Sequence, residues 1–284
     1  MQRTGAHNKN KIPVTVVVPV KNEQTSIAQC LEKLGPFETV VVIDSDSTDR
    51  TIEIAEKYPV EIINFKWSGQ YPKKRNWFLL SGEITTEWVL FVDADEFLTT
   101  EFCDELQAEL ANSTKSGYWI NYRKYYFGKM LKHGVRQKKI ALFKAGAGLY
   151  EKLNETNSNG FDMEIHEHPI IQGDTGVIKS KIDHVDNRGL ANLMEKHVEY
   201  AQWECDRLLS KMQKAGGETD EETFRQSLKN KYMGMWWFGT AYFILDYIIC
   251  FGFLDGASGF RYARLKKWYF ETIRLLLLEK RNGK

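Results

Sequence analysis

Three carboxylates stand within four positions of the stretch EWVLFVDADEFLT (residues 87–99): Asp93, Asp95 and Glu96. They follow an apolar run that is typical of a buried strand, so their mutual repulsion requires a compensating partner. Two carboxylates one residue apart in a loop can bind a hard divalent cation that also bridges to substrate phosphates. The alternative is an acidic helix start, because TEFCDELQAEL (100–110) follows and acids there favour the helix dipole.

Apolar runs and helical periodicity indicate the elements that must position these acids. Strands are predicted at 14–20, 39–44, 60–65 and 88–93, and helices at 25–34, 47–58 and 73–82, with Ser47 or Thr48 as the cap of the second helix. This alternation predicts an α/β fold with a doubly wound sheet. Asp44 and Asp93 then stand at strand carboxyl ends, where ligands bind in such sheets.

Four segments occur in an order and spacing that resemble the family 2 nucleotide-sugar glycosyltransferases. These are VVVPVKNE (16–23), VVIDSDSTDRT (41–51), KKRN (73–76) and LFVDADE (90–96). The resemblance implies a GT-A fold, which is a Rossmann-like mixed sheet, and an inverting transfer from a nucleoside-diphosphate sugar. The later segments MEIHEHP (163–169), KIDHVD (181–186) and GFLDGASGFRYARL (252–265) look most like the bacterial branch of lipopolysaccharide-core glucosyltransferases.

The resemblance also implies a nucleotide-sugar site, formed by Pro19, Glu23, Asp44, Arg75, Asn76, Asp93 and Ala94. Carboxylates at Glu23 and Asp44 suit the N–H and hydroxyl donors of a base and a ribose, and a guanidinium at Arg75 suits a phosphate or a uracil carbonyl. Structural alternatives exist for each residue. Glu23 could start a helix, Asp44 could cap its own loop, and Lys73, Lys74 and Arg75 could form an exposed basic turn.

A metal site with Mn²⁺ or Mg²⁺ is expected at the same place. Asp95 is the candidate direct ligand, and Asp93 would reach the ribose or, through water, the metal. Glu96 could orient the ligands or start the next helix. His184 matches a histidine that often completes the metal site late in GT-A folds, although a histidine at a strand end can also be purely structural.

An inverting transfer needs a general base on the acceptor side of the sugar. EIHEH (164–168) lies where the family keeps its acceptor-side carboxylate, so Glu167 is the predicted base and Glu164 the reserve. The sequence has HEH there instead of the usual Glu-Asp pair. His166 and His168 suggest zinc, but a third protein ligand is missing from the pattern.

The sequence predicts three regions: a flexible N-terminus (1–11), a GT-A catalytic domain (12–190) and a helical C-terminal region (191–284). The catalytic domain divides into a nucleotide-binding half (12–110) and an acceptor half (111–190). Residues 233–254 are apolar but marginal for crossing a bilayer, and residues 261–281 mix Arg and Lys with Trp, Tyr and Leu, as in a helix at a membrane interface. Alternatively, the two segments form a hairpin that packs on the catalytic domain or on a second subunit.

Composition sets the remaining limits. A net charge of +1 argues against a nucleic-acid binder driven by bulk electrostatics, and Cys30, Cys103, Cys205 and Cys250 lack metal or redox spacing, so we expect reduced thiols in an intracellular protein. The expected activity is transfer of a hexose from a nucleoside-diphosphate sugar, with a UDP-sugar favoured, to a lipopolysaccharide-type or lipid-linked glycan at the cytoplasmic face of the membrane. The alternatives are a polyprenyl-phosphate sugar synthase and a catalytically silent scaffold; a homo-oligomer is possible for each.

Overall fold

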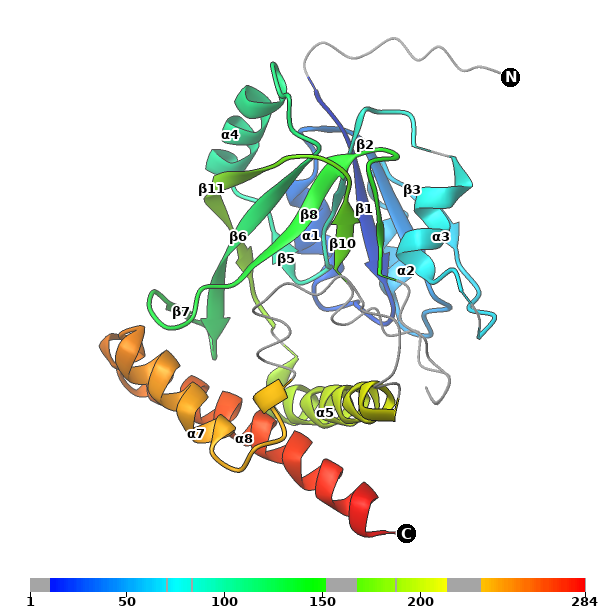
Figure 1. Cartoon of the computed structure of the whole chain (residues 1–284). Helices are drawn as coiled ribbons and strands as arrows, with labels where there is room; N and C mark the ends of the chain where they lie inside the picture. Colours follow the sequence, from blue (N-terminus) through cyan, green and yellow to red (C-terminus); the bar gives the residue numbers. More distant parts are fainter. Residues whose placement is uncertain are drawn as a thin grey trace. The chain divides into compact units, whose positions relative to one another are not determined.

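The computed structural model describes residues 11–69, 71–82, 84–151, 168–186, 188–213 and 231–283. These residues fall into two compact units. The first draws on Met1–Tyr125, Gln137–Asn154 and Gly160–Asn187, and the second on Tyr126–Arg136, Glu155–Asn159 and Arg188–Lys284. The first unit is an α/β domain built on one large sheet, whereas the second is mainly helical (Figure 1).

The sheet of the first unit contains a parallel half and a mixed half. The parallel strands are β1 (Ile12–Val20), β2 (Phe37–Asp44), β3 (Glu61–Asn64) and β4 (Trp88–Phe91). The others are β5 (Glu96–Phe97), β6 (Gly117–Tyr126), β8 (Lys138–Lys144) and β11 (Thr175–His184). The spatial order is β3-β2-β1-β4-β8-β6-β11-β5, with β8 antiparallel to both neighbours. This mixed, doubly wound α/β sheet confirms the predicted fold class.

Helices cover both faces of this sheet, as the continuous apolar runs require. On one face, α1 (Ile27–Lys33), α2 (Thr51–Ala55) and α4 (Thr100–Leu110) pack on alternate residues of β1 such as Val16 and Val18. On the other face, α3 (Lys74–Ser81) packs through Phe78 on Val17. The short pair β9 (Gly148–Tyr150) and β10 (Pro169–Ile171) lies on this second face. Burying each such apolar side chain contributes about 1.5–3 kcal/mol to folding.

The predicted cap of α2 was wrong. The helix begins at Thr51, after Arg50, and Asp49 instead accepts a hydrogen bond from Thr51 N through Oδ1 at 3.0 Å. Ser47 Oγ donates to Asp44 at 2.5 Å, and Thr48 N donates to Asn22 Oδ1 at 2.8 Å. The serine and threonine therefore join the loop after β2 to the loop after β1, which competes with capping.

The second unit comprises β7 (Lys129–Leu131), α5 (Gly189–Gln213), α7 (Phe238–Phe243), the π-helix η1 (Ile244–Ile249), the 3₁₀-helix η2 (Gly252–Asp255) and α8 (Gly256–Asn282). Its main core joins α5 and α8 through residues that include Ala201, Cys205, Phe270 and Ile273. No single helix in the described ranges is long and apolar enough to cross a bilayer. Among the residues that the structure describes, one pair, Phe238–Ile249 and Gly252–Asn282, meets that criterion together and is bent by 72°.

Candidate active site at the carboxyl end of β4

Residues 93–96 form a tight turn directly after β4. Glu96 N donates to Asp93 O at 2.9 Å, and Asp93 N donates to Glu96 Oε2 at 3.1 Å. Val92 N donates to Val17 O at 3.0 Å, which keeps the start of the turn attached to β1. The turn therefore holds its three carboxylates on a short loop that is braced against the middle of the sheet.

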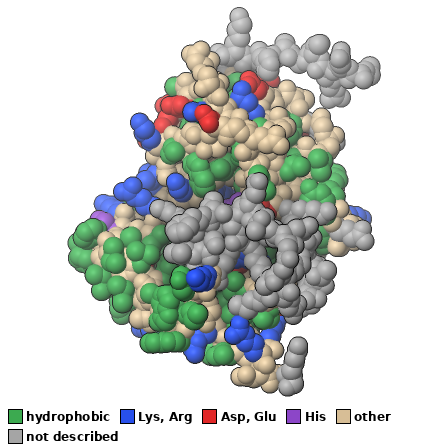
Figure 2. All heavy atoms as spheres, in the orientation of Figure 1, with side chains coloured by type: hydrophobic (Ala, Val, Ile, Leu, Met, Phe, Trp, Pro, Cys, Tyr) green, Lys and Arg blue, Asp and Glu red, His purple; other side chains and the backbone are tan. Residues whose placement is uncertain are grey.

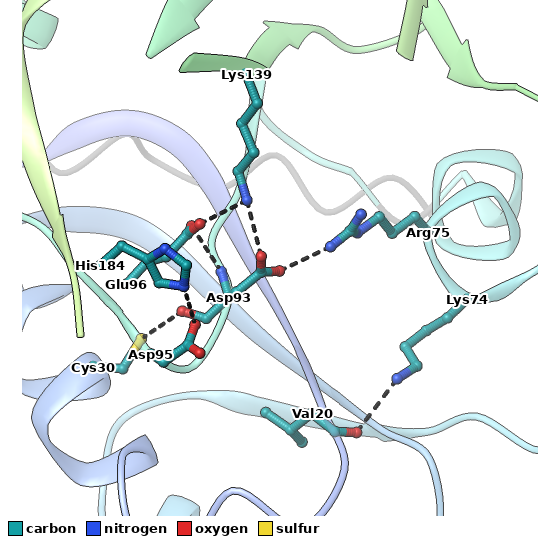
Figure 3. Close-up of polar contacts among 9 residues, drawn as sticks. All are labelled: Val20, Cys30, Lys74, Arg75, Asp93, Asp95, Glu96, Lys139 and His184. Carbon is teal, nitrogen blue, oxygen red and sulfur yellow. Dashed lines mark hydrogen bonds and ion pairs between the residues drawn. The ribbon is translucent and has the colours of Figure 1, made fainter. Parts of the chain in front are cut away.

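Asp93 is held by two cations from different elements (Figure 3). Arg75, in the first turn of α3, donates from Nη2 to Asp93 Oδ1 at 2.8 Å, and Lys139 on β8 donates from Nζ to Asp93 Oδ2 at 2.9 Å. Burial alone would raise the pKa of Asp93, but the charges of Lys139 and Arg75 outweigh burial and lower it well below its ordinary value. Asp93 is therefore a carboxylate with both oxygens engaged.

Lys139 also binds the most deeply buried acid of the turn. Its Nζ donates to Glu96 Oε1 at 2.7 Å, and the Glu96 side chain is only 2% exposed. Burial raises the pKa of Glu96 above its ordinary value, with Lys139 acting in the opposite direction and the nearby Asp93 charge adding to the rise. One lysine thus compensates two acids. The sequence analysis missed Lys139, because only the antiparallel pairing of β8 with β4 brings this strand beside the turn.

Asp95 faces away from these cations and toward His184. The pairing of β11 with β5 sets His184 opposite Glu96, and Val185 N donates to Asp95 O at 2.9 Å. His184 Nε2 lies 3.6 Å from Asp95 Oδ1 (Figure 3). Burial disfavours the charged imidazole, but the Asp95 carboxylate, assisted by Glu96, raises the pKa of His184 to about 9. His184 thus lies beside Asp95, and its role in completing a metal site stays a prediction.

A bulge in β11 sets the strand register that places His184 beside Asp95. The pairing of β11 with β6 shifts between Ile178 and Lys181, and Glu105 from α4 accepts the backbone amides released there. Lys179 N and Ser180 N donate to its carboxylate at 2.8 and 2.7 Å. Bulges commonly redirect side chains beside functional sites. The Glu105 carboxylate stabilises this bulge by accepting its two backbone amides.

Asp95 and His184 suit a divalent cation with few protein ligands once the cation displaces the imidazole proton, because only the neutral imidazole binds a metal. Their side chains are 14% and 33% exposed, so solvent or a ligand can reach both. Across the described part of the chain, no three His, Cys, Asp or Glu side chains converge as a complete metal site. Mg²⁺ and Mn²⁺ commonly take only one or two carboxylates and complete their coordination with water and substrate phosphates, which fits this pair. Asp93, the third expected member, points to Arg75 and Lys139 instead.

The loops after β1 and β2 form a second polar area at the same edge of the sheet. Asp44, only 4% exposed, accepts hydrogen bonds from Ser47 N at 3.0 Å and Ser47 Oγ at 2.5 Å. Glu23 accepts from Ser26 Oγ at 3.1 Å just before α1. Asp44 thus makes the loop-capping contacts named as its alternative, whereas α1 begins only at Ile27, after Ser26, so Glu23 precedes the helix. Their roles in binding a nucleoside stay predictions. Pro19 lies in β1, one residue before its end, and Ala94 is buried in the turn.

The basic segment at the start of α3 is buried, which rules out the exposed-turn alternative. Lys73 and Lys74 are each 6% exposed, and Lys74 Nζ donates to Val20 O at 3.4 Å. Asn76 donates to Tyr150 O at 2.9 Å and accepts from Tyr150 N at 2.8 Å. Asn76 therefore joins α3 to β9, and Arg75 is the residue of this segment that reaches the acidic turn.

The predicted base, Glu167, its reserve Glu164 and His166 lie outside the described residues. The strands that precede and follow this segment are described: Tyr150 of β9 pairs with Pro169 of β10. The Arg75 guanidinium lies 5.2 Å from the centre of the Tyr150 ring. Both described ends of the segment are therefore close to α3. His168 is exposed, and its carbonyl accepts from Glu151 N at 3.1 Å.

Cys30 is a further residue that the motif analysis did not connect with the site. It is fully buried on α1, and its Sγ lies 3.9 Å from Asp93 O, beneath the turn. Burial, followed by the charges of Glu96, Asp95 and Asp93, raises the pKa of this thiol well above its ordinary value. Cys30 is thus a neutral packing residue, and all four cysteines are free, as predicted for reduced thiols.

Comparison with known proteins identifies the class of fold and then the family. The structure of the mannosyltransferase PcManGT from Pyrobaculum calidifontis, in complex with GDP-Man and Mn²⁺, matches with a TM-score of 0.52 at 16% identity, covering 94% of this chain and 87% of that one. The fold is therefore GT-A. The profile of glycosyl transferase family 2 matches residues 15–184, which is more than half of the chain. The chain belongs to this family.

Two curated relatives extend the similarity beyond the motifs. An uncharacterised glycosyltransferase of Rickettsia conorii is 27% identical over 256 residues, covering 87% of this chain and 83% of the relative. The lipopolysaccharide core biosynthesis glycosyltransferase LpsC of Rhizobium meliloti is 25% identical over 174 residues, covering 58% of this chain and 60% of LpsC. The predicted family is thereby confirmed.

Proposed function

We propose that this glycosyltransferase is a metal-dependent, inverting enzyme. It transfers a hexose from a nucleoside-diphosphate sugar, most simply a UDP-sugar, to a lipopolysaccharide-type or lipid-linked envelope glycan at the cytoplasmic face of the membrane. The observation that carries this proposal is the turn at residues 93–96, where Arg75, Lys139 and His184 converge on three carboxylates. The similarity to LpsC supports the acceptor class.

The cations of the turn are suited to receive the donor's diphosphate. Arg75 and Lys139 are neutralised by Asp93 and Glu96 in this structure, and both have side chains long enough to turn toward a phosphate. Asp95 and His184 would hold the divalent cation, which supplies positive charge at the leaving diphosphate. Glu23 and Asp44 would accept hydrogen bonds from the base and ribose, since their loops border the same edge of the sheet.

The transfer itself joins an acceptor hydroxyl oxygen to the anomeric carbon while the bond from that carbon to the diphosphate breaks. Attack comes from the face opposite the diphosphate, so the configuration inverts. Glu167 takes the hydroxyl proton in this proposal, and Arg75 and Lys139 stabilise the charge that develops on the diphosphate. The proximity of β9 and β10 to Arg75 supports a base on this segment.

Donor consumption tests the proposal. The full chain is incubated with UDP-, GDP- and dTDP-sugars, with Mn²⁺, Mg²⁺ or EDTA, and with or without cell-envelope extract. We expect one donor to be consumed, faster with extract and not with EDTA. A scaffold would bind a donor without consuming it, and a polyprenyl-phosphate sugar synthase would need only the lipid phosphate as acceptor.

The base assignment is tested separately with Glu167→Gln. This change keeps the side-chain shape but removes the proton acceptor, so kcat should fall by roughly 10²–10⁴ while the affinities for UDP and metal stay near wild type. Glu164→Gln is the matched control. If Glu164→Gln shows that loss and Glu167→Gln turns over normally, Glu164 is the base.

A further inference from the structure

Large hydrophobic side chains are exposed together at one edge of the second unit. Ile248, Ile249, Phe251, Phe253 and Leu254 are between 44% and 61% exposed. They belong to η1, η2 and the link between them, and residues 244–254 are called the apolar tip below. Figure 2 shows hydrophobic side chains gathered over the region where Figure 1 draws α7. Monomeric soluble proteins rarely expose a contiguous apolar area of this kind without a partner.

Aromatic contacts connect several rings of the apolar tip with one another and with Phe260 of α8. The Tyr247 ring lies 6.3 Å from Phe253 and 5.5 Å from Phe260, and Phe251 lies 6.1 Å from Phe253. Trp236, which precedes α7, is 74% exposed. Tryptophan combines an apolar ring with one N–H donor, which suits the boundary between headgroups and hydrocarbon.

In the described segments 126–136 and 231–270, no carboxylate faces outward. Across residues 126–136 and 231–270 the only acids are Asp246 and Asp255, and they are 2% and 6% exposed. Val135 N donates to Asp246 Oδ1 at 2.7 Å, and His133 N donates to Asp255 Oδ2 at 2.9 Å. Both carboxylates thus hold the 132–135 loop, so the described segments 126–136 and 231–270 present no outward negative charge to an anionic surface.

The exposed charges in the same segments are all positive. Lys129, Lys132, Arg136, Arg261 and Arg264 are exposed and are called the basic rim below. An apolar area flanked by Lys and Arg matches a bilayer that carries anionic lipids, since the long side chains can keep their charges at the headgroups. A second copy of this chain would present the same positive rim, and like charges would oppose pairing through this edge.

We propose that the apolar tip and the basic rim dock into the interface of an anionic bilayer, with the tip reaching the boundary of the acyl chains. This surface includes only Arg261 and Arg264 of the helix at 261–281 that the sequence pattern suggested. The structure packs Tyr269, Phe270, Ile273 and Leu277 of that helix into the core with α5. Docking is a property of the second unit and does not depend on the proposed sugar transfer.

Vesicle flotation with the full chain tests this surface. Vesicles of phosphatidylcholine alone are compared with vesicles containing one quarter phosphatidylglycerol, in low salt and in 0.5 M NaCl. We expect flotation with the anionic vesicles and about tenfold weaker partitioning in high salt, because the rim charges are screened. Absence of flotation with anionic vesicles in low salt would overturn the proposal.

Matched double variants locate the surface. Ile249→Glu with Leu254→Glu should reduce partitioning at least about tenfold, since two exposed aliphatic side chains no longer enter the acyl boundary. Leu275→Glu with Leu278→Glu, on the exposed side of the far end of α8, should leave it unchanged. Equal loss in both variants would overturn the assignment to the tip. Circular dichroism confirms that each variant is folded.

Charge variants and the oligomeric state complete the test. Arg261→Gln with Arg264→Gln should weaken partitioning more than Lys33→Gln with Lys66→Gln, which removes equal charge from exposed positions of the first unit. Asp95→Ala should bind vesicles as wild type does, which separates docking from donor turnover. A dimer in ultracentrifugation that the tip variant dissociates, without lipid binding, would instead assign the tip to a second copy.

Discussion

Each unit contains a pair of carboxylates held by internal partners, but the partners differ in kind. In the first unit, Asp93 and Glu96 are held by the side-chain cations Arg75 and Lys139. In the second unit, Asp246 and Asp255 are held by backbone amides of residues 132–135. Gly134 shows how close the second arrangement is, because a Cβ at this position would lie 2.8 Å from Asp246 Oδ1.

This difference separates an adaptable arrangement from a rigid one. Arg75 and Lys139 can rotate toward a ligand without moving the backbone, so the turn at residues 93–96 can exchange internal ion pairs for contacts with substrate. Backbone amides cannot turn away unless the loop itself unfolds. We therefore expect the carboxylates of the turn at residues 93–96 to affect activity, with a further cost in stability where a buried ion pair is broken, and the carboxylates held by backbone amides to affect stability alone. Four substitutions test this distinction, in order of decreasing expected effect.

Asp95→Ala should have the largest effect, on activity. The proposed metal site has only two protein ligands, and the loss of one should lower kcat/KM for the donor by about 10²–10³ or more. Donor consumption during a Mn²⁺ titration measures this. Asp46→Ala is the control, because Asp46 is exposed and accepts a hydrogen bond from the Asn64 side-chain amide at 3.2 Å, away from the acidic turn. Wild-type activity of Asp95→Ala without added metal would refute the assignment.

Lys139→Gln should lower the free energy of unfolding by about 3 kcal/mol, because it leaves Glu96 buried without its cation. Urea denaturation measures this loss. Lys138→Gln is the matched control on the neighbouring residue, whose ammonium lies 4.7 Å from the Trp119 ring centre. Adding Glu96→Gln to Lys139→Gln should restore much of the stability. If it does not, the lysine stabilises the fold by packing and not by charge compensation.

Asp44→Ala distinguishes a donor-binding acid from a loop cap. Asp44 accepts backbone and hydroxyl hydrogen bonds from Ser47, which resembles the arrangement in the second unit. If it also binds the nucleoside, KM for the donor should rise by a factor that corresponds to about 1–3 kcal/mol. Steady-state kinetics and thermal unfolding are compared on the same preparation. A loss of stability with an unchanged KM would place Asp44 with the structural acids.

Asp255→Asn should have the smallest effect, a loss of about 1.5 kcal/mol in unfolding free energy with unchanged donor turnover. Burial would raise the pKa of Asp255, but hydrogen bonds from His133 outweigh it and lower the pKa. A lowered folded-state pKa gives stability that is present above the ordinary carboxyl range and is lost as the pH falls.

The difference in stability between wild type and Asp255→Asn should therefore shrink between pH 5 and pH 3, as measured by urea denaturation. Asp174→Asn is the control, because the Asp174 side chain is 85% exposed. A difference that stays constant with pH would show that the carboxylate charge contributes nothing to holding the 132–135 loop.

The strands and helices of the nucleotide-binding half follow from local pattern. Continuous β-branched runs such as residues 14–20 are stable in a sheet only when both of its faces are covered. Because these runs alternate with short amphipathic helices, few sheet topologies are possible. The acids at 93–96 and 44 were also recognisable, because they interrupt apolar runs where parallel strands end. For α2, however, local pattern misplaced the cap, since Ser47 and Thr48 found partners in the loops after β2 and β1.

By itself the sequence determined which residues would stand at the edge of the sheet, and the tertiary structure decided which of them meet. Lys139 carries no motif, and it reaches Asp93 and Glu96 only because β8 inserts antiparallel beside β4. His184 reaches Asp95 through strand pairing and a bulge far along the chain. Residues 261–281 have an interfacial composition, but packing against α5 buries much of their apolar side. The sequence specifies which charged and apolar side chains the chain contains, whereas contacts between distant strands and helices determine which of these side chains meet and which remain exposed.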